Sequence, residues 1–157
     1  MAIMDELGQF NTEGTPYDLD QENATYVLPN SIDLGLTGRD PGMGQPVYLN
    51  IVVTEAFTDG GDSATLSFSL NSDSVEDVAE SGSTIHLITP PLLKAALVAG
   101  ARYSYTVPPA GGGNTYERYL GLMAIIATAG FDSGMVEAWL GHDPIGIHIG
   151  GFADATN

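Results

Sequence analysis

Alternation between apolar and polar positions is the strongest pattern in this chain, and it predicts β-strands. The clearest case is residues 64–73, where three apolar side chains alternate with three small hydroxyl side chains: Leu66, Phe68 and Leu70 with Thr65, Ser67 and Ser69. Successive side chains of a strand point to opposite faces of its sheet. We therefore expect the apolar set to be buried and the hydroxyl set to face water.

Similar patterns predict further short strands along most of the chain. Runs rich in β-branched and aromatic residues occupy residues 25–28, 46–57, 83–89, 101–108, 116–129 and 133–141. In the run 83–89, Ile85 and Leu87 should share one face, opposite His86 and Ile88. The turn-forming residues Asp59–Asp62 predict a hairpin between the strands that flank them. Residues 92–100 fit a short helix or a loop.

These elements predict an all-β fold in a single domain over residues 1–157. Because strands and helices do not alternate, an antiparallel sandwich or barrel is expected rather than an α/β fold. We assign residues 26–141 to the sandwich, 1–25 to an extended N-terminal arm, and 142–157 to a Gly-rich C-terminal tail with little to pack. A polar arm with a few apolar anchors is expected to lie across its own domain or a neighbour. We favour contact with a neighbouring subunit or another protein through three apolar side chains: Ile3, Leu7 and Phe10.

The net charge of the chain limits the classes of molecule that we expect it to bind. Four basic residues stand against twenty acidic ones, for a formal net charge of −16. Nucleic-acid affinity comes largely from Lys and Arg that neutralise phosphates, so we expect no binding to DNA or RNA. The same reasoning weighs against an anionic membrane surface. A strong net charge also keeps proteins soluble, and the acidity has that role unless some of the carboxylates bind calcium or reflect adaptation to salt.

Candidate chemistry is sparse. The chain has no cysteine, which excludes thiol catalysis and Cys-based zinc sites, and it lacks the Gly-x-Ser-x-Gly nucleophile motif. Its histidines, His86, His142 and His148, do not have the spacing of zinc ligands, and His86 is expected to face outward from its strand or to lie in an interface. Acidic loops supply oxygen ligands for calcium at Asp59 with Asp62 and over 73–77, without the EF-hand spacing. We therefore expect no enzyme and no cofactor.

Tyrosines leave one alternative open. Tyr103, Tyr105, Tyr116 and Tyr119 lie on or beside predicted strands, where they would form part of the core or of an interface. Exposed on one face, they would instead suit a carbohydrate-binding β-sandwich module. A cupin-type enzyme would need several metal-binding histidines on strands, and only His86 lies on a regular one.

An ordered set of short motifs resembles one protein family along nearly the whole chain. These are IDLG at 32–35, RDPGMGQP at 39–46, FTDGG at 57–61 and RYLG at 118–121. In this order they resemble the capsid cement, or decoration, proteins of tailed bacteriophages of the Bordetella phage type. The resemblance implies a jelly-roll-like β-sandwich that sits on the outer surface of the phage head and ties major capsid proteins together.

The same resemblance implies the partners and the place of action. They are the major capsid protein and further copies of the chain, as a dimer or alternatively a trimer, on the virion after synthesis in the host cytoplasm. The candidate partner-binding residues are the three apolar arm residues and two residues of the loop over 35–46: Ile3, Leu7, Phe10, Arg39 and Met43.

Overall fold

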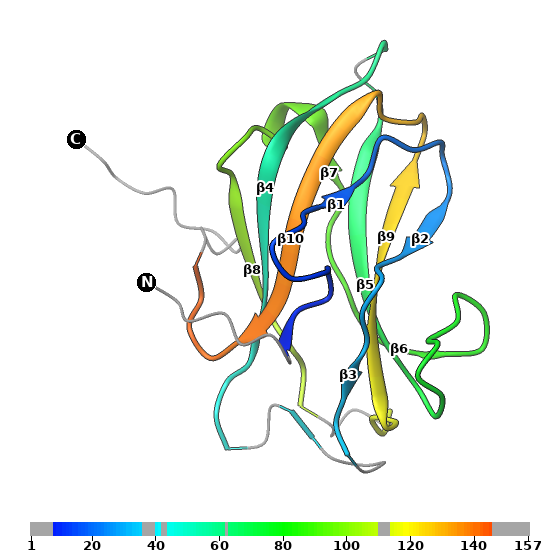
Figure 1. Cartoon of the computed structure of the whole chain (residues 1–157), viewed down its shortest axis with the longest axis vertical. Coiled ribbons are helices and arrows are strands. Elements are labelled where there is room, and N and C mark those ends of the chain that lie inside the picture. The colour runs from blue at the N-terminus through cyan, green and yellow to red at the C-terminus, as the bar shows by residue number, and fades with distance from the viewer. Residues whose placement is uncertain (1–7, 36–39, 42–43, 62, 110–113, 146–157) are drawn as a thin grey trace.

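The chain folds into a sandwich of two antiparallel β-sheets (Figure 1). The computed structural model describes residues 8–35, 40–41, 44–61, 63–109 and 114–145. Its strands are β1 (Tyr17–Asp18), β2 (Thr25–Val27), β3 (Ile32–Asp33), β4 (Tyr48–Thr58), β5 (Thr65–Asp73), β6 (Thr84–Ile88), β7 (Leu92–Leu93), β8 (Arg102–Thr106), β9 (Tyr119–Ala127) and β10 (Ser133–Gly141). One turn of 3₁₀ helix, η2 (Lys94–Ala96), follows β7.

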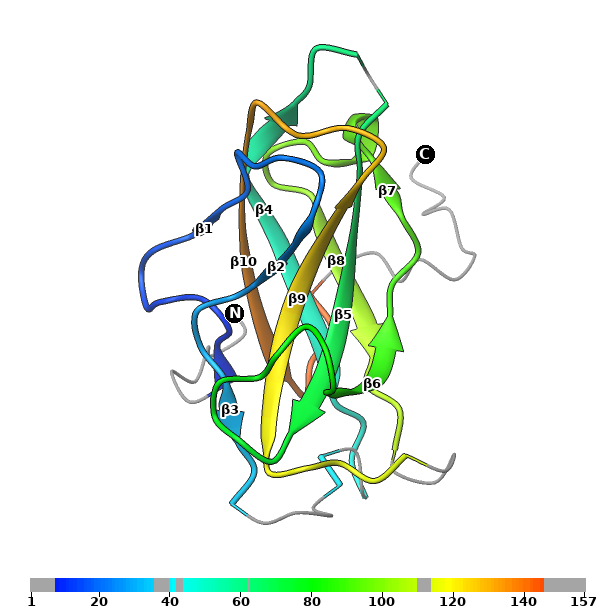
Figure 2. The same ribbon diagram turned by 90° about the vertical axis from the view of Figure 1, so that its right-hand side faces the viewer.

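Each sheet has a central strand that pairs on both of its edges, β4 in one sheet and β5 in the other. The β4 sheet has the strand order β1-β10-β4-β8, and the β5 sheet has the order β2-β9-β5-β6, with β3 also paired to β9 and β7 to β5. Figure 2 shows the β5 sheet from outside, with β6, β7 and β8 together along one side of the sandwich. The predicted all-β sandwich is confirmed, while the jelly-roll winding stays a prediction.

The core lies between the two sheets, where alternation places apolar side chains. Leu66, Phe68 and Leu70 of β5 are all fully buried, as their spacing predicts. They face the apolar side of β4, whose Leu49, Ile51 and Val53 are at most 1% exposed. Burying one such side chain is worth about 1.5–3 kcal/mol relative to leaving it in water. Packing between β4 and β5 therefore contributes strongly to the stability of the sandwich.

The predicted hairpin between β4 and β5 is wrong. β4 pairs with β8 on one side and β10 on the other, whereas β5 pairs with β9 and with β6 and β7. Both strands thus have neighbours on each edge and cannot pair with one another. The turn after β4 carries the chain across the core, from one sheet to the other.

The outer face of the β5 sheet is covered where the sequence predicts contact with water. Ser69 and Asn71 are each 2% exposed, and the loop over residues 74–83 crosses part of this face (Figure 2). Val78 of the loop packs over Gly121 of β9 so closely that a Cβ at position 121 would lie 2.7 Å from the Cβ of Val78. Asn71 Nδ2 donates a hydrogen bond to Ser83 Oγ at 2.9 Å and holds the far end of the loop. The alternation of apolar and polar residues identifies the two faces of β5 correctly, but it does not reveal that a loop packs on the outer face of the sheet.

A β-bulge changes which side chains of β6 face inward. Leu87 pairs with Leu70 while Ile85 pairs with Asn71, so His86 is the extra residue and the register shifts there. Ile85 and Leu87 therefore lie on opposite faces, contrary to the expectation from simple alternation. Ile85 and Ile88 are 47% and 56% exposed, whereas Leu87 packs against the core.

Residues 92–100 form neither the predicted helix nor a simple loop. Leu92 and Leu93 pair with Leu66 and Thr65 as β7, and only the 3₁₀ turn η2 follows. Leu92 is 7% exposed and belongs to the core, so an extended backbone buries it beside β5. Pairing with β5 thus outweighs the helix propensity of this segment.

The described part of the predicted arm belongs to the sandwich. Phe10 and Leu19 are fully buried in the core, and β1 pairs with β10. The backbone N–H of Phe10 donates to the carbonyl of Ala138 at 2.9 Å, and Asn11 Oδ1 accepts from the Ala138 N–H at 3.0 Å. Phe10 is therefore an internal anchor and not an exposed side chain of a free arm.

The start of the predicted C-terminal tail also packs. The side chains of Asn50 and Ser104 lie on the outer face of the β4 sheet and are at most 1% exposed. Asn50 Nδ2 donates to the carbonyl of Asp143 at 3.0 Å, and the Ile145 N–H donates to Ser104 Oγ at 3.0 Å. These bonds bind residues 142–145 to the sheet.

We predict that Phe10→Ala lowers the free energy of unfolding by about 3–5 kcal/mol, as for other large-to-small substitutions of buried aromatic residues. Urea unfolding of the full chain measures this change. Glu13→Ala is the control, because Glu13 is exposed in the same segment and should alter stability by no more than about 0.5 kcal/mol. Equal stability of both variants would show that Phe10 does not anchor the domain.

Candidate interaction face

One side of the sandwich differs from the rest of the chain in charge. None of the twenty acidic residues lies between positions 81 and 116, a segment that contains β6, β7, η2 and β8. β6 and β8 are the end strands of their sheets, and Figure 2 places them on the same side of the sandwich. We call the exposed surface of this part of the chain, from β6 to β8 (residues 84–106), the neutral face.

Exposed apolar side chains gather on the neutral face. Among the described residues, six large apolar side chains are more than a third exposed, and four of them are here: Ile85, Ile88, Leu93 and Val98, at 47–57%. Ile85, Ile88 and Leu93 pair with Asn71, Ser69 and Thr65, which alternate along the outer face of β5. The three side chains therefore line one edge of the β5 sheet. Large contiguous apolar patches on a soluble protein commonly mark interaction sites.

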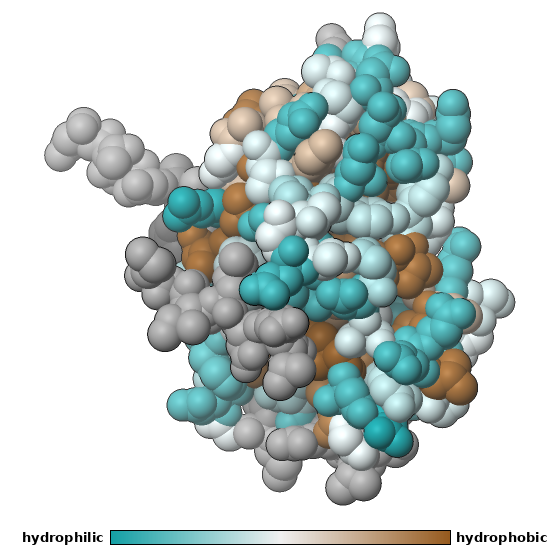
Figure 3. Space-filling view, in the orientation of Figure 1, coloured by the Kyte–Doolittle hydropathy of each residue, from teal (hydrophilic) through white to brown (hydrophobic). Residues whose placement is uncertain are grey.

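The opposite side of the sandwich has a different surface. Figure 3 views the molecule from the side of β1 and β10, where hydrophilic side chains predominate and apolar residues show only as small, separate areas. The other two exposed large apolar side chains, Val27 and Val75, lie outside the neutral face, on β2 and on the loop over 74–83. The exposed surface is thus divided by both charge and hydropathy.

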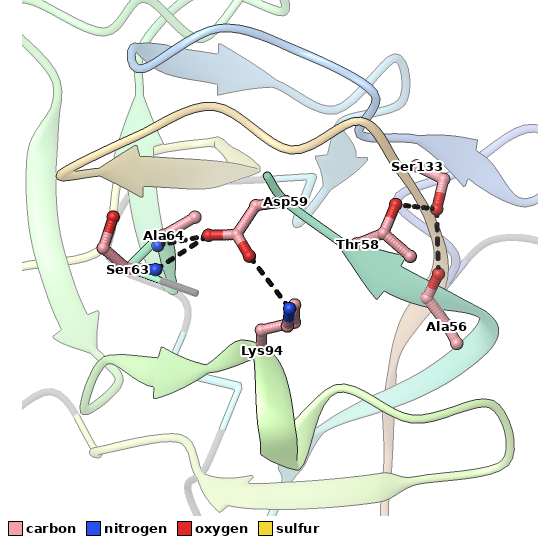
Figure 4. A network of polar contacts seen from close by, with 7 residues as sticks. All are labelled: Ala56, Thr58, Asp59, Ser63, Ala64, Lys94 and Ser133. Atoms are coloured by element: carbon pink, nitrogen blue, oxygen red, sulfur yellow. Dashed lines mark hydrogen bonds and ion pairs between the residues drawn. The ribbon is translucent and has the colours of Figure 1, made fainter. Parts of the chain in front are cut away.

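A buried ion pair holds one end of the neutral face in place (Figure 4). Asp59 lies in the turn after β4, with a side chain only 1% exposed, and its Oδ1 is 3.2 Å from Lys94 Nζ of η2. Its Oδ2 accepts hydrogen bonds from the backbone N–H groups of Ser63 at 2.9 Å and Ala64 at 2.7 Å. The bond from Ala64 and the charge of Lys94 hold the pKa of Asp59 below its usual value.

This junction joins the crossover between the sheets to η2. Because Asp59 stays ionised, it balances the charge of Lys94, one of the two cations in the acid-free segment. Nearby, Thr58 Oγ1 and Ser133 Oγ lie 2.8 Å apart and link the end of β4 to the start of β10. The neutral face therefore carries little net charge, and the Asp59–Lys94 ion pair fixes the position of η2 within it.

An aromatic stack holds the other end. The His86 ring lies on the Tyr116 ring with their centroids 3.8 Å apart and their planes 17° from parallel. His86 Nε2 is 2.7 Å from Ser72 Oγ, which also accepts the backbone N–H of Glu117 at 2.9 Å. His86 is therefore half-buried and packed inward, not outward as expected, because the bulge turns its side chain toward the end of the core.

Ser72 and His86 have the spacing of a nucleophile and its general base. Ser72 is 0% exposed, however, so its Oγ is inaccessible to a substrate. The N–H of Glu117 already occupies an acceptor position on that oxygen. The geometry suits a structural link between β5, β6 and the segment before β9.

An acidic groove lies on another part of the surface, with a volume of about 630 Å³. Its lining comes from residues 29–33, the loop over 74–83 and residue 9: Gln9, Pro29, Asn30, Ser31, Asp33, Glu76 and Asp77. Asp33 binds the Arg118 guanidinium through two hydrogen bonds of 2.8 and 2.9 Å, which together with the Gly35 N–H lower the pKa of Asp33 to about 2. The described part of the chain contains no group of three or more side chains placed to ligate a metal.

The structure brings few of the sequence-predicted partner residues together. Phe10 lies in the core, and Ile3, Leu7, Arg39 and Met43 fall outside the described residues. Three of the tyrosines considered for carbohydrate binding are buried instead: Tyr103, Tyr105 and Tyr116. No helix in the described ranges has the length and apolar character needed to cross a membrane.

Sequence reasoning missed the neutral face, although a signal for it exists. Ile85, Ile88, Leu93 and Val98 look like ordinary strand and helix residues when each is taken alone. The absence of acidic residues over 36 consecutive positions stands out only against the acidity of the remainder. Charge distribution along the chain would therefore have indicated the segment, though not which of its apolar side chains are exposed.

Comparison with known proteins identifies one family. The family described as Bbp16 matches residues 22–140, which run from just before β2 to the penultimate residue of β10. No curated protein matches the chain.

We predict that Asp59→Ala lowers the melting temperature more than Asp33→Ala does. The first change removes a buried carboxylate that accepts from the N–H groups of Ser63 and Ala64 and pairs with Lys94, whereas the second removes an exposed ion pair, and exposed pairs contribute little. Thermal unfolding followed by circular dichroism compares the two variants. If Asp33→Ala has the larger effect, the junction at η2 is not a main support.

We predict that His86 makes stability fall as the pH drops below about 6.5, the usual pKa of histidine in an unfolded chain. Burial lowers the pKa of His86 in the folded protein, although Glu117 opposes the shift, so the unfolded chain takes up a proton first. The free energy of unfolding of the wild type minus that of His86→Gln should shrink between pH 8 and pH 5. A difference that grows toward low pH would contradict this assignment. The other titrating groups are common to both proteins.

Proposed function

The chain belongs to the Bbp16 family, and we propose that it is a capsid cement protein of a tailed bacteriophage. In this role it binds the outer surface of the phage head and stabilises contacts between major capsid proteins. The observation that carries the proposal is the family match over residues 22–140, since the name of the family suggests a Bordetella phage protein. The order of motifs along the chain supports the same assignment.

The architecture suits a structural role. Cementing a shell relies on many weak contacts repeated over a lattice, so avidity supplies the strength and a deep pocket is unnecessary. The sandwich provides a rigid body, and the described parts of the loops over 35–46 and 108–116 lie at the same end of it (Figure 1). We propose that this end of the sandwich faces the shell.

Specific residues are proposed for the capsid contact. Arg39 and Met43 belong to the loop over 35–46, and Ile3 and Leu7 precede Phe10 in the sequence. Because Phe10 is anchored in the core beside β10, the residues before it start from a fixed point on the sandwich. Arg39 is one of only four basic residues, so it would give an acidic protein a specific charged contact.

The proposed role is not catalytic and does not involve nucleic acid or a membrane. Burial of Ser72 supports the first part, because the serine–histidine pair that the described residues form, Ser72 with His86, is closed to substrates. The net charge of −16 supports the second, because phosphates would be repelled over most of the surface. The protein would be made in the host cytoplasm and carried on the virion.

We expect the purified full chain to bind undecorated shells of the phage's major capsid protein saturably and on their outer surface. Co-sedimentation measures the bound fraction, and electron cryomicroscopy of the complex locates the added density. Failure to bind, or density inside the shell, would overturn the proposal.

Arg39→Glu should weaken shell binding several-fold without lowering the melting temperature. The matched control is the double variant Gln21→Glu/Asn23→Asp, which makes the same change of two charges at exposed positions between β1 and β2. If the control weakens binding as much as Arg39→Glu does, overall charge and not Arg39 governs the contact.

A further inference from the structure

We propose that the acidic groove binds an arginine side chain carried by an extended segment of a partner protein. The groove is the hollow of about 630 Å³ between residues 29–33 and the loop over 74–83. Figure 2 shows this loop crossing the β5 sheet toward β3. The inference goes beyond the capsid role and does not depend on it, because a free peptide is enough to test it.

A buried amide without a partner points to a ligand. Gln9 lines the groove with only 7% of its surface exposed, and its backbone pairs with Trp139 of β10. Its carboxamide makes no hydrogen bond with the other described residues, yet its atoms are still accessible, so they open into the groove. Polar groups this deeply buried are nearly always hydrogen-bonded, because leaving them without a partner costs free energy. A ligand in the groove would supply the missing partner.

The charges around the groove favour a cation. Glu76 and Asp77 are exposed on the wall that the loop forms, and neither has an ion-pair partner within the described ranges. Asp33 on the opposite wall is bound by the Arg118 guanidinium, so its charge is already balanced. Two carboxylates therefore remain to attract a positive group, and the strong net negative charge of the chain attracts it from a distance.

The polar atoms of the groove suit a guanidinium better than other cations. Carboxylate and amide oxygens accept hydrogen bonds, and a guanidinium presents several N–H donors in a planar fork. Asn30 adds an acceptor, because its Nδ2 already donates to the carbonyl of Asn11 at 2.8 Å and its Oδ1 is left over. Among the described residues no three side chains are placed to ligate a metal, so an organic cation fits the groove better than a metal ion.

The neutral part of the lining indicates that the arginine arrives on a peptide. The groove is larger than one guanidinium group, so some of the flanking backbone would enter with it. The carboxamide of Gln9 can both donate and accept, as can the hydroxyl of Ser31, and a peptide backbone offers the matching C=O and N–H groups. A bare cation would leave these groups without partners.

Both walls of the groove are fixed before a ligand binds. Asn11 Oδ1 accepts the N–H of Ala138, and the bond from Asn30 to Asn11 ties the wall over 29–33 to β10. Val78 packs over Gly121 and holds the opposite wall against β9. A site that is already ordered loses less conformational entropy on binding than a mobile one. The groove is thus prepared to bind a short segment.

Nuclear magnetic resonance of the isotope-labelled full chain tests the proposal. We expect acetyl-Gly-Arg-Gly-amide to shift the side-chain amide signals of Gln9 saturably at physiological ionic strength. The same peptide with lysine should bind at least about fivefold more weakly, because an ammonium group cannot form the planar, two-pronged contact. The peptide with citrulline keeps the shape of arginine without its charge, and it should not bind.

The double variant Glu76→Gln/Asp77→Asn should raise the dissociation constant of the arginine peptide at least about tenfold. The matched control, Glu55→Gln/Asp132→Asn, removes the same two charges at exposed positions near the start of β10. These positions lie about 20 Å along that strand from the residue that pairs with Gln9. The control should change the dissociation constant less than about twofold. All four positions are exposed, so circular dichroism should show folded proteins.

The proposal is wrong if the arginine peptide leaves the Gln9 amide signals unchanged. Equal binding of the lysine or the citrulline peptide would also contradict it, as would equal weakening by both double variants, since overall charge would then explain the binding. Gln9→Met keeps the net charge and a similar side-chain shape but lacks the amide, so it should weaken binding several-fold. Undiminished binding by a folded Gln9→Met protein would show that the buried amide does not recognise the ligand.

Discussion

The packing of β4 against β5 is the contact on which the rest of the structure depends. The two strands have 11 and 9 residues, and their apolar faces meet across the core. Each is the central strand of its own sheet, so every other strand is placed by pairing, directly or through one neighbour, with one of them. The turn between them has to cross the core, which places Asp59 where it binds the backbone of the turn and Lys94 of η2. The support of the neutral face is thus a consequence of how the two sheets are joined.

Much of the fold could be predicted from the sequence because alternation reports directly on burial. The inward set on β5 and the tyrosines of β8 are placed as their spacing indicates. Pairing between strands could not be predicted in the same way, since a turn motif such as Asp59–Asp62 is compatible with a hairpin and with a crossover. The cover over Gly121 and the inward turn of His86 depend on a loop and on a bulge, and both arise from contacts that spacing along one strand does not show.

The candidate site could be predicted only in part, for a related reason. Ile88 and Leu93 are apolar residues of short β-elements, and sequence patterns treat such residues as core. Whether another strand covers them is decided by the order of strands in the sheet, which leaves β6 and β7 at its edge. Phe10 shows the converse case, because an isolated apolar residue in a polar segment looks like a contact for a partner. Its burial follows from the pairing of residues 9–10 with β10, which local pattern does not reveal.

Val78 packs closely over Gly121, so the side chain that fits at either of these positions depends on the residue at the other. Any side chain at position 121 would occupy the space that Val78 fills, so the acidic loop could remain in place only if residue 78 became smaller. Substitutions at the two positions should therefore be strongly non-additive in their effect on stability. The same contact holds the loop that carries Glu76 and Asp77, which line the acidic groove together with Asn30. The packing of Val78 on Gly121 thus also affects the shape of the groove.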